Sequence, residues 1–118
     1  AQTAQQVITD TGSFKASEVE NLATKALGVL QENGLYAAAI FLYSRSGTDA
    51  KIAPFVRKGL LGLAAQEVVE QPTPEDQAQP ALKFVTDHIA GDLDTLLLVK
   101  QLWEQTLIYV RYGAKARR

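Results

Sequence analysis

Apolar residues recur at helical spacing over most of the chain, most clearly in the segment ASEVENLATKALGVLQENG. Their intervals of three and four residues place them on one face of an α-helix. Ser17 and Glu20 have the spacing of a capping box, in which each side chain accepts a hydrogen bond from a free backbone amide. Gly34 is typical of a helix end, because glycine adopts left-handed backbone angles at little cost. The expected apolar stripe is Val19, Leu22, Ala23, Ala26, Leu27 and Leu30.

The next stretch, NGLYAAAIFLYSRSG at residues 33–47, has two interpretations because it is almost entirely apolar. AIFLYS has the aromatic and β-branched content of a strand, and SRSGTD would suit a hairpin turn. YAAA, in contrast, is typical of a helix. We favour a central helix that is apolar nearly all round and whose far end brings Arg45 to the surface. Its inward face would hold Leu35, Ala38, Ala39, Leu42 and Tyr43, widened by Ile40 and Phe41.

A third helix is expected over PFVRKGLLGLAAQEVVE, with Pro54 tolerated in the first turn. Gly59 and Gly62 weaken this helix and allow a neighbouring helix to approach closely. The proline-rich QPTPEDQAQP is the main loop, and Thr73 followed by Pro74 resembles a helix cap and first turn. The inward residues of the third helix would be Phe55, Leu60, Leu63, Ala64 and either Val68 or Val69.

Two further helices complete the predicted fold. ALKFVTDHIAG forms a short helix that ends at Gly91, and Asp92 or Asp94 caps the longest helix, which follows. The pattern therefore predicts a single all-α domain over residues 1–118, a bundle of about five helices. It leaves open whether residues 1–13 are ordered. The core stripe of the last helix would be Leu96, Val99, Trp103, Leu107 and Val110.

Composition narrows the possible functions. Hydrophobic residues make up 47% of the chain and charged residues 21%, values ordinary for a globular domain. The absence of cysteine excludes a disulfide framework, a thiolate metal site and a cysteine nucleophile, and suits the reducing cytoplasm, where we expect the protein. No apolar run is long enough to cross a membrane. The chain begins with alanine and has no methionine, so either the initiator was removed or this is a piece of a longer chain.

Catalytic residues do not form a recognisable constellation. His88 is the only histidine, and a metal site or general base would draw on the nearby Asp87, Asp92 and Asp94. Gly91 breaks the helix between them, so a histidine near a helix C-terminus with aspartates capping the next helix is the better interpretation. The hydroxyls near Arg45 lack a neighbouring base, and no phosphate-binding loop is present. We therefore expect neither enzyme activity nor a cofactor or bound metal.

Aromatic residues of the last helix admit two roles. Trp103, Tyr109 and Tyr112 would stack on nucleic-acid bases if they were exposed. Aromatic residues at this spacing on a long apolar helix more often belong to the core, and we favour that interpretation.

The charges are segregated along the chain, although the formal net charge is only −1. Residues 67–94 contain seven acidic side chains against Lys83 alone, whereas residues 45–58 and 111–118 are basic. Such runs are often solvated faces, and cations in a last turn suit the helix dipole. They also suit phosphate binding. The residues of this kind that we select are Arg111, Lys115 and Arg117 first, then Arg45, Lys51, Arg57 and Lys58.

Two blocks, VLQENGLYAAAIFLYSRSG and LDTLLLVKQLWEQTLIYVRYGAKA, resemble the small α-helical subunit of type III-B CRISPR RNA-guided effector complexes. The resemblance covers about two-thirds of the chain and rests on packing motifs: the Asn-Gly-Leu corner, the buried small-and-aromatic helix and the aromatic end of the terminal helix. It implies a non-catalytic protein that stacks head to tail along a ribonucleoprotein. Its partners would be the other subunits and the backbones of the guide and target RNA, with no membrane involved.

The basic residues fit that implication, because phosphate contacts position a strand without reading its sequence. The alternative is a helical adaptor without a nucleic-acid role, whose grooves would be built around AAAIFLY and Trp103.

Overall fold

The computed structural model describes residues 2–117, and within them it contains six α-helices, one π-helical turn and no strand. The predicted all-α bundle is confirmed, with one α-helix more than the pattern indicated. None of the described helices is long and apolar enough to pass through a membrane. The elements are α1 (Gln2–Asp10), α2 (Ala16–Asn33), α3 (Leu35–Tyr43), α4 (Gly47–Leu63), η1 (Ala64–Val69), α5 (Ala78–His88) and α6 (Leu93–Ala116).

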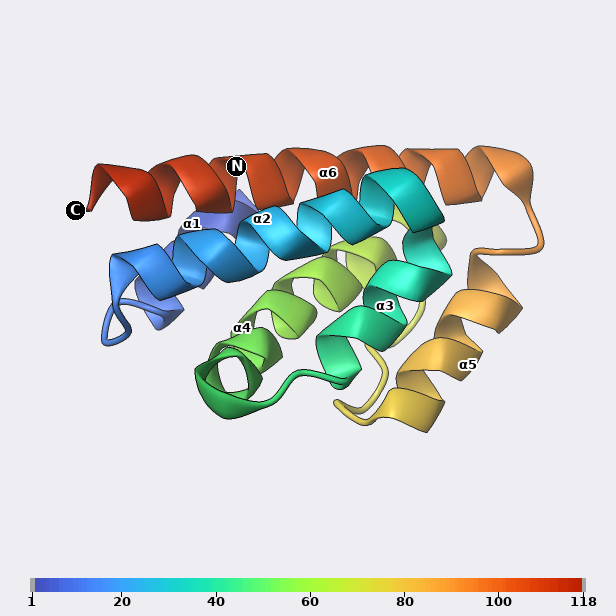
Figure 1. The fold of residues 1–118 in the computed structure, drawn as a ribbon. Coiled ribbons are helices and arrows are strands. Elements are labelled where there is room, and N and C mark those ends of the chain that lie inside the picture. Colours follow the sequence, from blue (N-terminus) through green and yellow to red (C-terminus); the bar gives the residue numbers. More distant parts are fainter. Residues whose placement is uncertain (1, 118) are drawn as a thin grey trace.

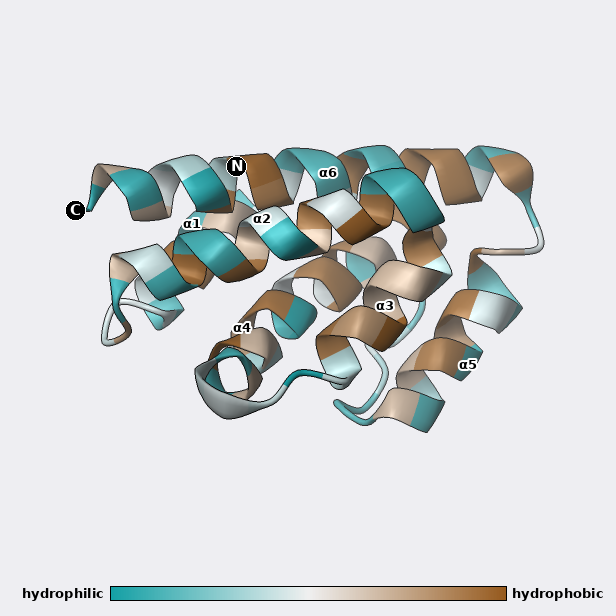
Figure 2. Cartoon of the chain, viewed as in Figure 1, coloured by the Kyte–Doolittle hydropathy of each residue, from teal (hydrophilic) through white to brown (hydrophobic). Residues whose placement is uncertain are grey.

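Helices α2 and α6 run antiparallel along the long axis and form the most extensive contact of the bundle (Figure 1). The 24 residues of α6 rise about 36 Å, close to the full 40 Å length of the molecule. Trp103 is fully buried, and its Nε1 donates a hydrogen bond to the carbonyl oxygen of Leu60 in α4 at 2.9 Å. The buried apolar residues of these helices line the shared interior, whereas the first turns of α6 also carry exposed leucines, and both helices can be followed in Figure 2. The predicted α6 stripe is confirmed at Val99, Trp103, Leu107 and Val110, while Leu96 is half-buried.

The ambiguous stretch forms α3, so the strand interpretation is wrong. Gly34 separates α2 from α3 with a φ of 93°, and its amide donates to the carbonyl of Leu30 at 3.1 Å. Because α3 contacts α2, α4 and α5 but leaves one side open, Tyr36 and Ile40 are exposed, and the prediction of a fully central helix is wrong. The predicted inward residues Leu35, Ala38, Ala39 and Leu42 are buried.

Helix α4 begins at Gly47, almost two turns before the predicted start, and Pro54 lies in its interior. Proline in a helix interior removes one backbone hydrogen bond and costs stability. Here the turn that precedes it contributes Ile52 and Ala53 to the core, and their burial favours the longer helix.

The cap predicted at Thr73 and Pro74 is also wrong. Residues 70–77 remain irregular, and α5 begins at Ala78 with Pro80 in its first turn. The physical reason is that Asp76 at the end of this loop is held by a side chain of α4, so the loop stays extended across the bundle instead of coiling.

The two predicted caps have different outcomes. The capping box at Ser17 is wrong, because α2 begins at Ala16 after Lys15, so Ser17 already lies inside the first turn. Asp92 does occupy the N-cap position of α6 as predicted, but its carboxylate makes no capping hydrogen bond to a backbone amide and instead accepts one from the Thr95 hydroxyl at 2.7 Å.

Residues 1–13, for which no element was predicted, contain α1. Ala4 and Val7 are buried, although α1 offers few large apolar side chains. Close packing of α1 against glycines of α4 and α6 compensates for the small number of large apolar side chains. A Cβ at Gly59 of α4 would lie 2.8 Å from Cγ2 of Val7, and a Cβ at Gly113 of α6 would overlap Cδ1 of Ile8. We call this pair, Gly59 and Gly113, the glycine notch.

The notch predicts opposite effects for two alanine substitutions in one helix. Gly59→Ala would force Val7 to move and is expected to destabilise the fold by about 1–3 kcal/mol. Gly62→Ala meets no atom within 4 Å, contrary to the close approach predicted there, and should stabilise α4 by about 0.5–1 kcal/mol. Urea unfolding of both variants measures the difference. A Gly59→Ala protein as stable as Gly62→Ala would contradict the notch.

Candidate nucleic-acid interface

The first group of predicted site residues lies on the last two turns of α6. No carboxylate among residues 2–117 lies within ion-pair distance of Arg111 or Lys115. The guanidinium carbon of Arg111 is 5.3 Å from the ring centroid of Tyr112, and Lys115 is exposed. Lys115 also complements the partial negative charge of the helix C-terminus, a structural role that leaves its ammonium accessible.

Arg117 follows α6 and has a structural role of its own. Its Nη1 donates to the carbonyl of Thr11 and its Nη2 to the carbonyl of Phe14, both at 3.3 Å. These bonds tie the end of the chain to the α1–α2 connection. Both acceptors are neutral and the residue is exposed, so its positive charge still contributes to this end of the molecule.

The second predicted group is dispersed over the end of α3 and along α4. Arg45 folds back on α3: its Nε donates to the carbonyl of Phe41 at 2.9 Å, and its guanidinium carbon lies 3.7 Å from the Phe41 ring centroid. Lys51 and Lys58 are exposed and form no ion pair within the described part of the chain.

Arg57 differs from the other candidates because its guanidinium is paired with a carboxylate inside the fold. Nε and Nη2 bind the two carboxylate oxygens of Asp76 at 2.7 and 2.9 Å, and Nη1 donates to the carbonyl of Leu42 at 2.8 Å. Its guanidinium carbon also lies 4.4 Å from the ring centroid of Tyr43. The side chain is only 13% exposed. We call this contact the Arg57–Asp76 latch, because it fastens the 70–77 loop to α4.

The latch shifts the pKa values of Asp76 and of the neighbouring Tyr43. The hydrogen bonds from Arg57 hold the pKa of the Asp76 carboxyl below its ordinary value, against the opposing effect of partial burial. Burial raises the pKa of the Tyr43 hydroxyl well above its ordinary value, and the nearby Asp76 carboxylate raises it further. The Asp76 carboxylate therefore remains charged, and the Tyr43 phenol neutral, at neutral pH.

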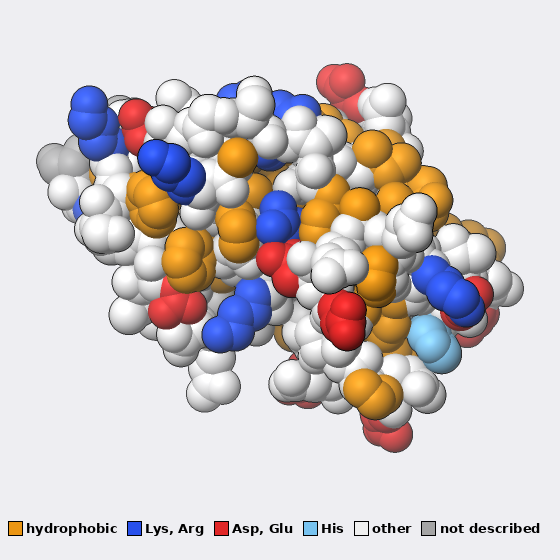
Figure 3. Space-filling model, turned by 90° about the horizontal axis from the view of Figure 1, so that it is seen from below, with side chains coloured by type: hydrophobic (Ala, Val, Ile, Leu, Met, Phe, Trp, Pro, Cys, Tyr) orange, Lys and Arg blue, Asp and Glu red, His pale blue; other side chains and the backbone are white. Residues whose placement is uncertain are grey.

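The structure does not join the two predicted groups into one site. The C-terminal end of α6 and the α3–α4 connection lie at different edges of the molecule (Figure 1). On the face seen in Figure 3, Lys and Arg side chains are separated by apolar, neutral and acidic ones. The acidic residues of segment 67–94 lie on η1, the following loop, α5 and the first turn of α6. Along α6 itself, the start is acidic and the end is basic.

The aromatic residues of α6 separate into two classes. Trp103 is in the core as predicted, but Tyr109 and Tyr112 are 55% and 57% exposed, so their assignment to the core is wrong. Both lie off the stripe that Trp103, Leu107 and Val110 define, and this offset was the available signal. The exposed pair stands beside Arg111 and Lys115.

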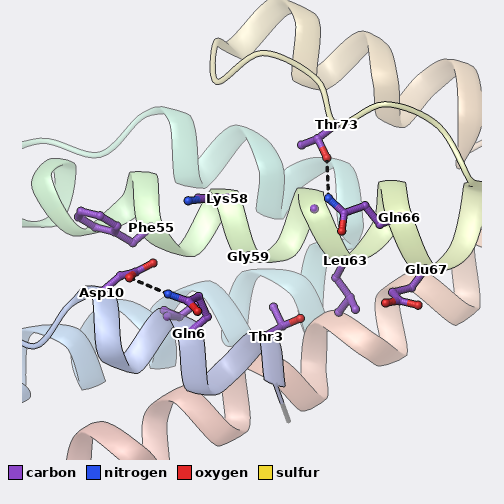
Figure 4. A pocket seen from close by; sticks show the side chains of 12 residues that line it. Thr3, Gln6, Asp10, Phe55, Lys58, Gly59, Leu63, Gln66, Glu67 and Thr73 are labelled. Atoms are coloured by element: carbon purple, nitrogen blue, oxygen red, sulfur yellow. Dashed lines mark hydrogen bonds between the residues drawn. The ribbon is translucent and has the colours of Figure 1, made fainter.

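A groove between α1 and α4, with a volume of about 330 Å³, was not predicted from the sequence (Figure 4). Gln6 donates to Asp10 at 2.9 Å on one wall, and the Gln66 amide is 3.5 Å from the Thr73 hydroxyl on the other. Lys58 borders the groove. Its lining combines amides, hydroxyls, two carboxylates and an ammonium without a histidine or cysteine, so it offers polar contacts but no nucleophile paired with a base.

His88 is exposed, and its ring centroid lies 5.3 Å from that of Phe84. Within residues 2–117 no group of three or more His, Cys, Asp or Glu side chains is placed to hold a metal ion. The geometry thus gives His88 a tilted ring contact with Phe84 at the end of α5.

Comparisons with protein-family models, with curated protein sequences and with solved structures gave no match. The family assignment suggested by the two sequence blocks therefore stays a prediction.

Proposed function

We propose that this chain is a non-catalytic small subunit of a CRISPR RNA-guided effector complex. In this role it stacks along the guide–target duplex with the other subunits and contacts the RNA backbone through basic residues, without a cofactor. The all-helical bundle supports the proposal, since the resembled family is all-helical. The resemblance of the two packing blocks is the reason for preferring this assignment over other helical RNA-binding proteins.

The basic end of α6 carries the RNA-binding part of the proposal. Arg111 and Lys115 have no carboxylate partner within residues 2–117, so their charges are available to phosphate without the loss of an internal ion pair. Lys51 and Lys58 are similarly available on α4, whereas the donors of Arg45, Arg57 and Arg117 are engaged within the fold.

The opposite charges at the two ends of α6 support head-to-tail stacking of copies. Asp92 and Asp94 lie at its start and are exposed, while Arg111 and Lys115 lie at its end. In a row of copies in the same orientation, the acidic end of one faces the basic end of the next, which favours that register.

The proposal predicts weak, salt-dependent and sequence-independent binding of single-stranded RNA. Each neutralised phosphate contributes about −0.7 to the slope of log affinity against log salt concentration. The double variant Arg111→Glu/Lys115→Glu should therefore reduce that slope by about 1.4 and weaken binding roughly tenfold or more at low salt. Fluorescence anisotropy of a labelled RNA across a salt series measures both quantities.

The matched control is Lys83→Glu, a charge reversal of an exposed lysine on α5 whose partner is Asp87. Lys83→Glu changes the net charge as much as Arg111→Glu or Lys115→Glu alone, but the residue lies in the acidic segment. Its effect on RNA affinity should therefore be smaller than that of either single variant. Wild-type protein that retains no RNA at low salt would refute RNA binding. Equal effects of the control and the α6 reversals would refute the site.

A helical adaptor without an RNA role is the second candidate, favoured by exposed apolar side chains. Leu93, at the start of α6, is 66% exposed, and Leu97 and Leu98 are also exposed. Tyr36 and Ile40 add exposed apolar surface on α3, although Trp103 is buried and cannot contribute. Co-purification of one protein partner that withstands nuclease treatment, together with no RNA affinity, would favour the adaptor.

A further inference from the structure

Tyr109 and Tyr112 form the exposed aromatic surface on the second half of α6. They are three residues apart, so their Cβ atoms lie about 5–6 Å from each other on one face of the helix. Each exposes more than half of its surface, and neither contributes to the core. Two large aromatic rings exposed side by side form an apolar patch of the kind that marks interaction sites on folded domains.

The charges around these rings identify the chemistry of that molecule. Arg111 approaches the Tyr112 ring, and Lys115 follows Tyr112 at the same three-residue spacing. From residue 105 to residue 117 the chain contains no acidic side chain, and Glu104 stands more than a turn before Tyr109. Aromatic faces interspersed with cations that have no carboxylate partner within residues 2–117 match the two needs of a single strand, stacking for bases and positive charge for phosphates.

We propose that Tyr109 and Tyr112 are a stacking platform for unpaired bases of single-stranded RNA, with Arg111 and Lys115 holding the adjoining phosphates. The inference rests on the proposed RNA contact and specifies its substrate class. A backbone-only contact would accept a duplex and a single strand alike, whereas a stacking platform requires bases free of their pairing partners. Because every base has a π-face, the platform would also bind without regard to sequence.

An abasic strand separates stacking from phosphate binding. It carries the ribose-phosphate backbone and its charges but has no base to place on a ring. The experiment compares three labelled 12-nucleotide RNAs by anisotropy at one low salt concentration: a mixed-sequence single strand, the same strand paired as a duplex, and an abasic strand of equal length. A 2-aminopurine in the mixed strand reports stacking directly through fluorescence quenching.

For the wild type we expect the mixed single strand to bind at least tenfold more tightly than the abasic strand, since stacking contributes about fivefold or more per base and the platform offers two rings. Tyr109→Leu/Tyr112→Leu should remove that advantage and the quenching, while its affinity for the abasic strand stays unchanged. Tyr109→Phe/Tyr112→Phe keeps both rings and should retain the advantage. Tyr36→Leu, an exposed tyrosine on α3, is the matched control and should change nothing.

The outcomes distinguish this inference from the function on which it rests. If the mixed and abasic strands bind equally well and the leucine variant alters neither, the stacking platform is refuted while backbone binding stands. If the wild type binds none of the three RNAs, the RNA-binding proposal is refuted together with the platform. Helical circular dichroism of each variant, compared with wild type, verifies that the exposed substitutions leave the fold intact.

Discussion

Trp103→Ala is expected to lower the free energy of unfolding by about 3–5 kcal/mol, the largest effect of any single substitution considered. The indole is 1% exposed at the contact of α6 with α4, and its removal leaves a cavity between helices that cannot collapse independently. For a domain of this size the loss corresponds to a fall in melting temperature of roughly 12–20 °C. Thermal unfolding followed by circular dichroism measures it.

Trp103→Phe tests whether the indole hydrogen bond contributes separately. This variant keeps most of the buried ring but removes the donor to the Leu60 carbonyl, and it should cost about 1–2 kcal/mol. Gln105→Ala, an exposed position two residues away, should be nearly neutral. A Trp103→Ala protein that melts within a few degrees of wild type would contradict the placement of this side chain in the core.

Removal of the Arg57–Asp76 latch has the second largest expected effect on stability. Arg57→Met abolishes three hydrogen bonds from a mostly buried guanidinium and should lower the free energy of unfolding by about 2–3 kcal/mol. Arg57→Lys should recover only part of this, because an ammonium cannot bind both carboxylate oxygens and a carbonyl as the planar fork does. Urea unfolding at neutral pH gives the values, with Lys58→Met as the matched control on exposed surface.

The latch also makes a pH-dependent contribution with a defined sign. The pKa of Asp76 is lower in the folded protein, so the contribution is fully present above the ordinary carboxyl pKa and is lost as pH falls through the lowered folded value. The stability difference between wild type and Asp76→Asn should therefore shrink under acidic conditions. A difference that stays constant from neutral to strongly acidic pH would contradict the ion pair.

Local pattern was sufficient to predict the elements whose apolar stripes are long. Helices α2 and α6 belong to this class, and Gly34 separates α2 from α3 through its own backbone angles. The helix α1 was missed because its apolar side chains are few and its docking depends on Gly59 and Gly113, which are distant in sequence. The start of α4 was misplaced because the proline signal is local, whereas the burial of Ile52 is tertiary.

The candidate site shows the same difference between features that follow from local sequence and features that depend on tertiary contacts. The sequence shows how many cationic residues there are and in what order, but whether each is exposed or bound within the fold depends on contacts between distant segments. Arg57 was selected for RNA, and only the fold reveals that Asp76, 19 residues later, occupies its donors. The exposure of Tyr112 follows from which face of α6 meets α2, a fact that spacing alone suggests but does not fix.

The glycine notch links the start of the chain to its end. A nine-residue helix is too short to persist alone in water, so α1 stays helical only while it is packed against α4 and α6. The carbonyls of Thr11 and Phe14, which follow α1, are the acceptors for Arg117. If α1 undocked, the hydrogen bonds of Arg117 to these carbonyls would be lost, and Val7 and Ile8 would become exposed at the same time. Transient detachment of the first helix is thus coupled to how the positive charge of Arg117 is held at the other end of the chain, and amide hydrogen exchange in α1 would report the detachment.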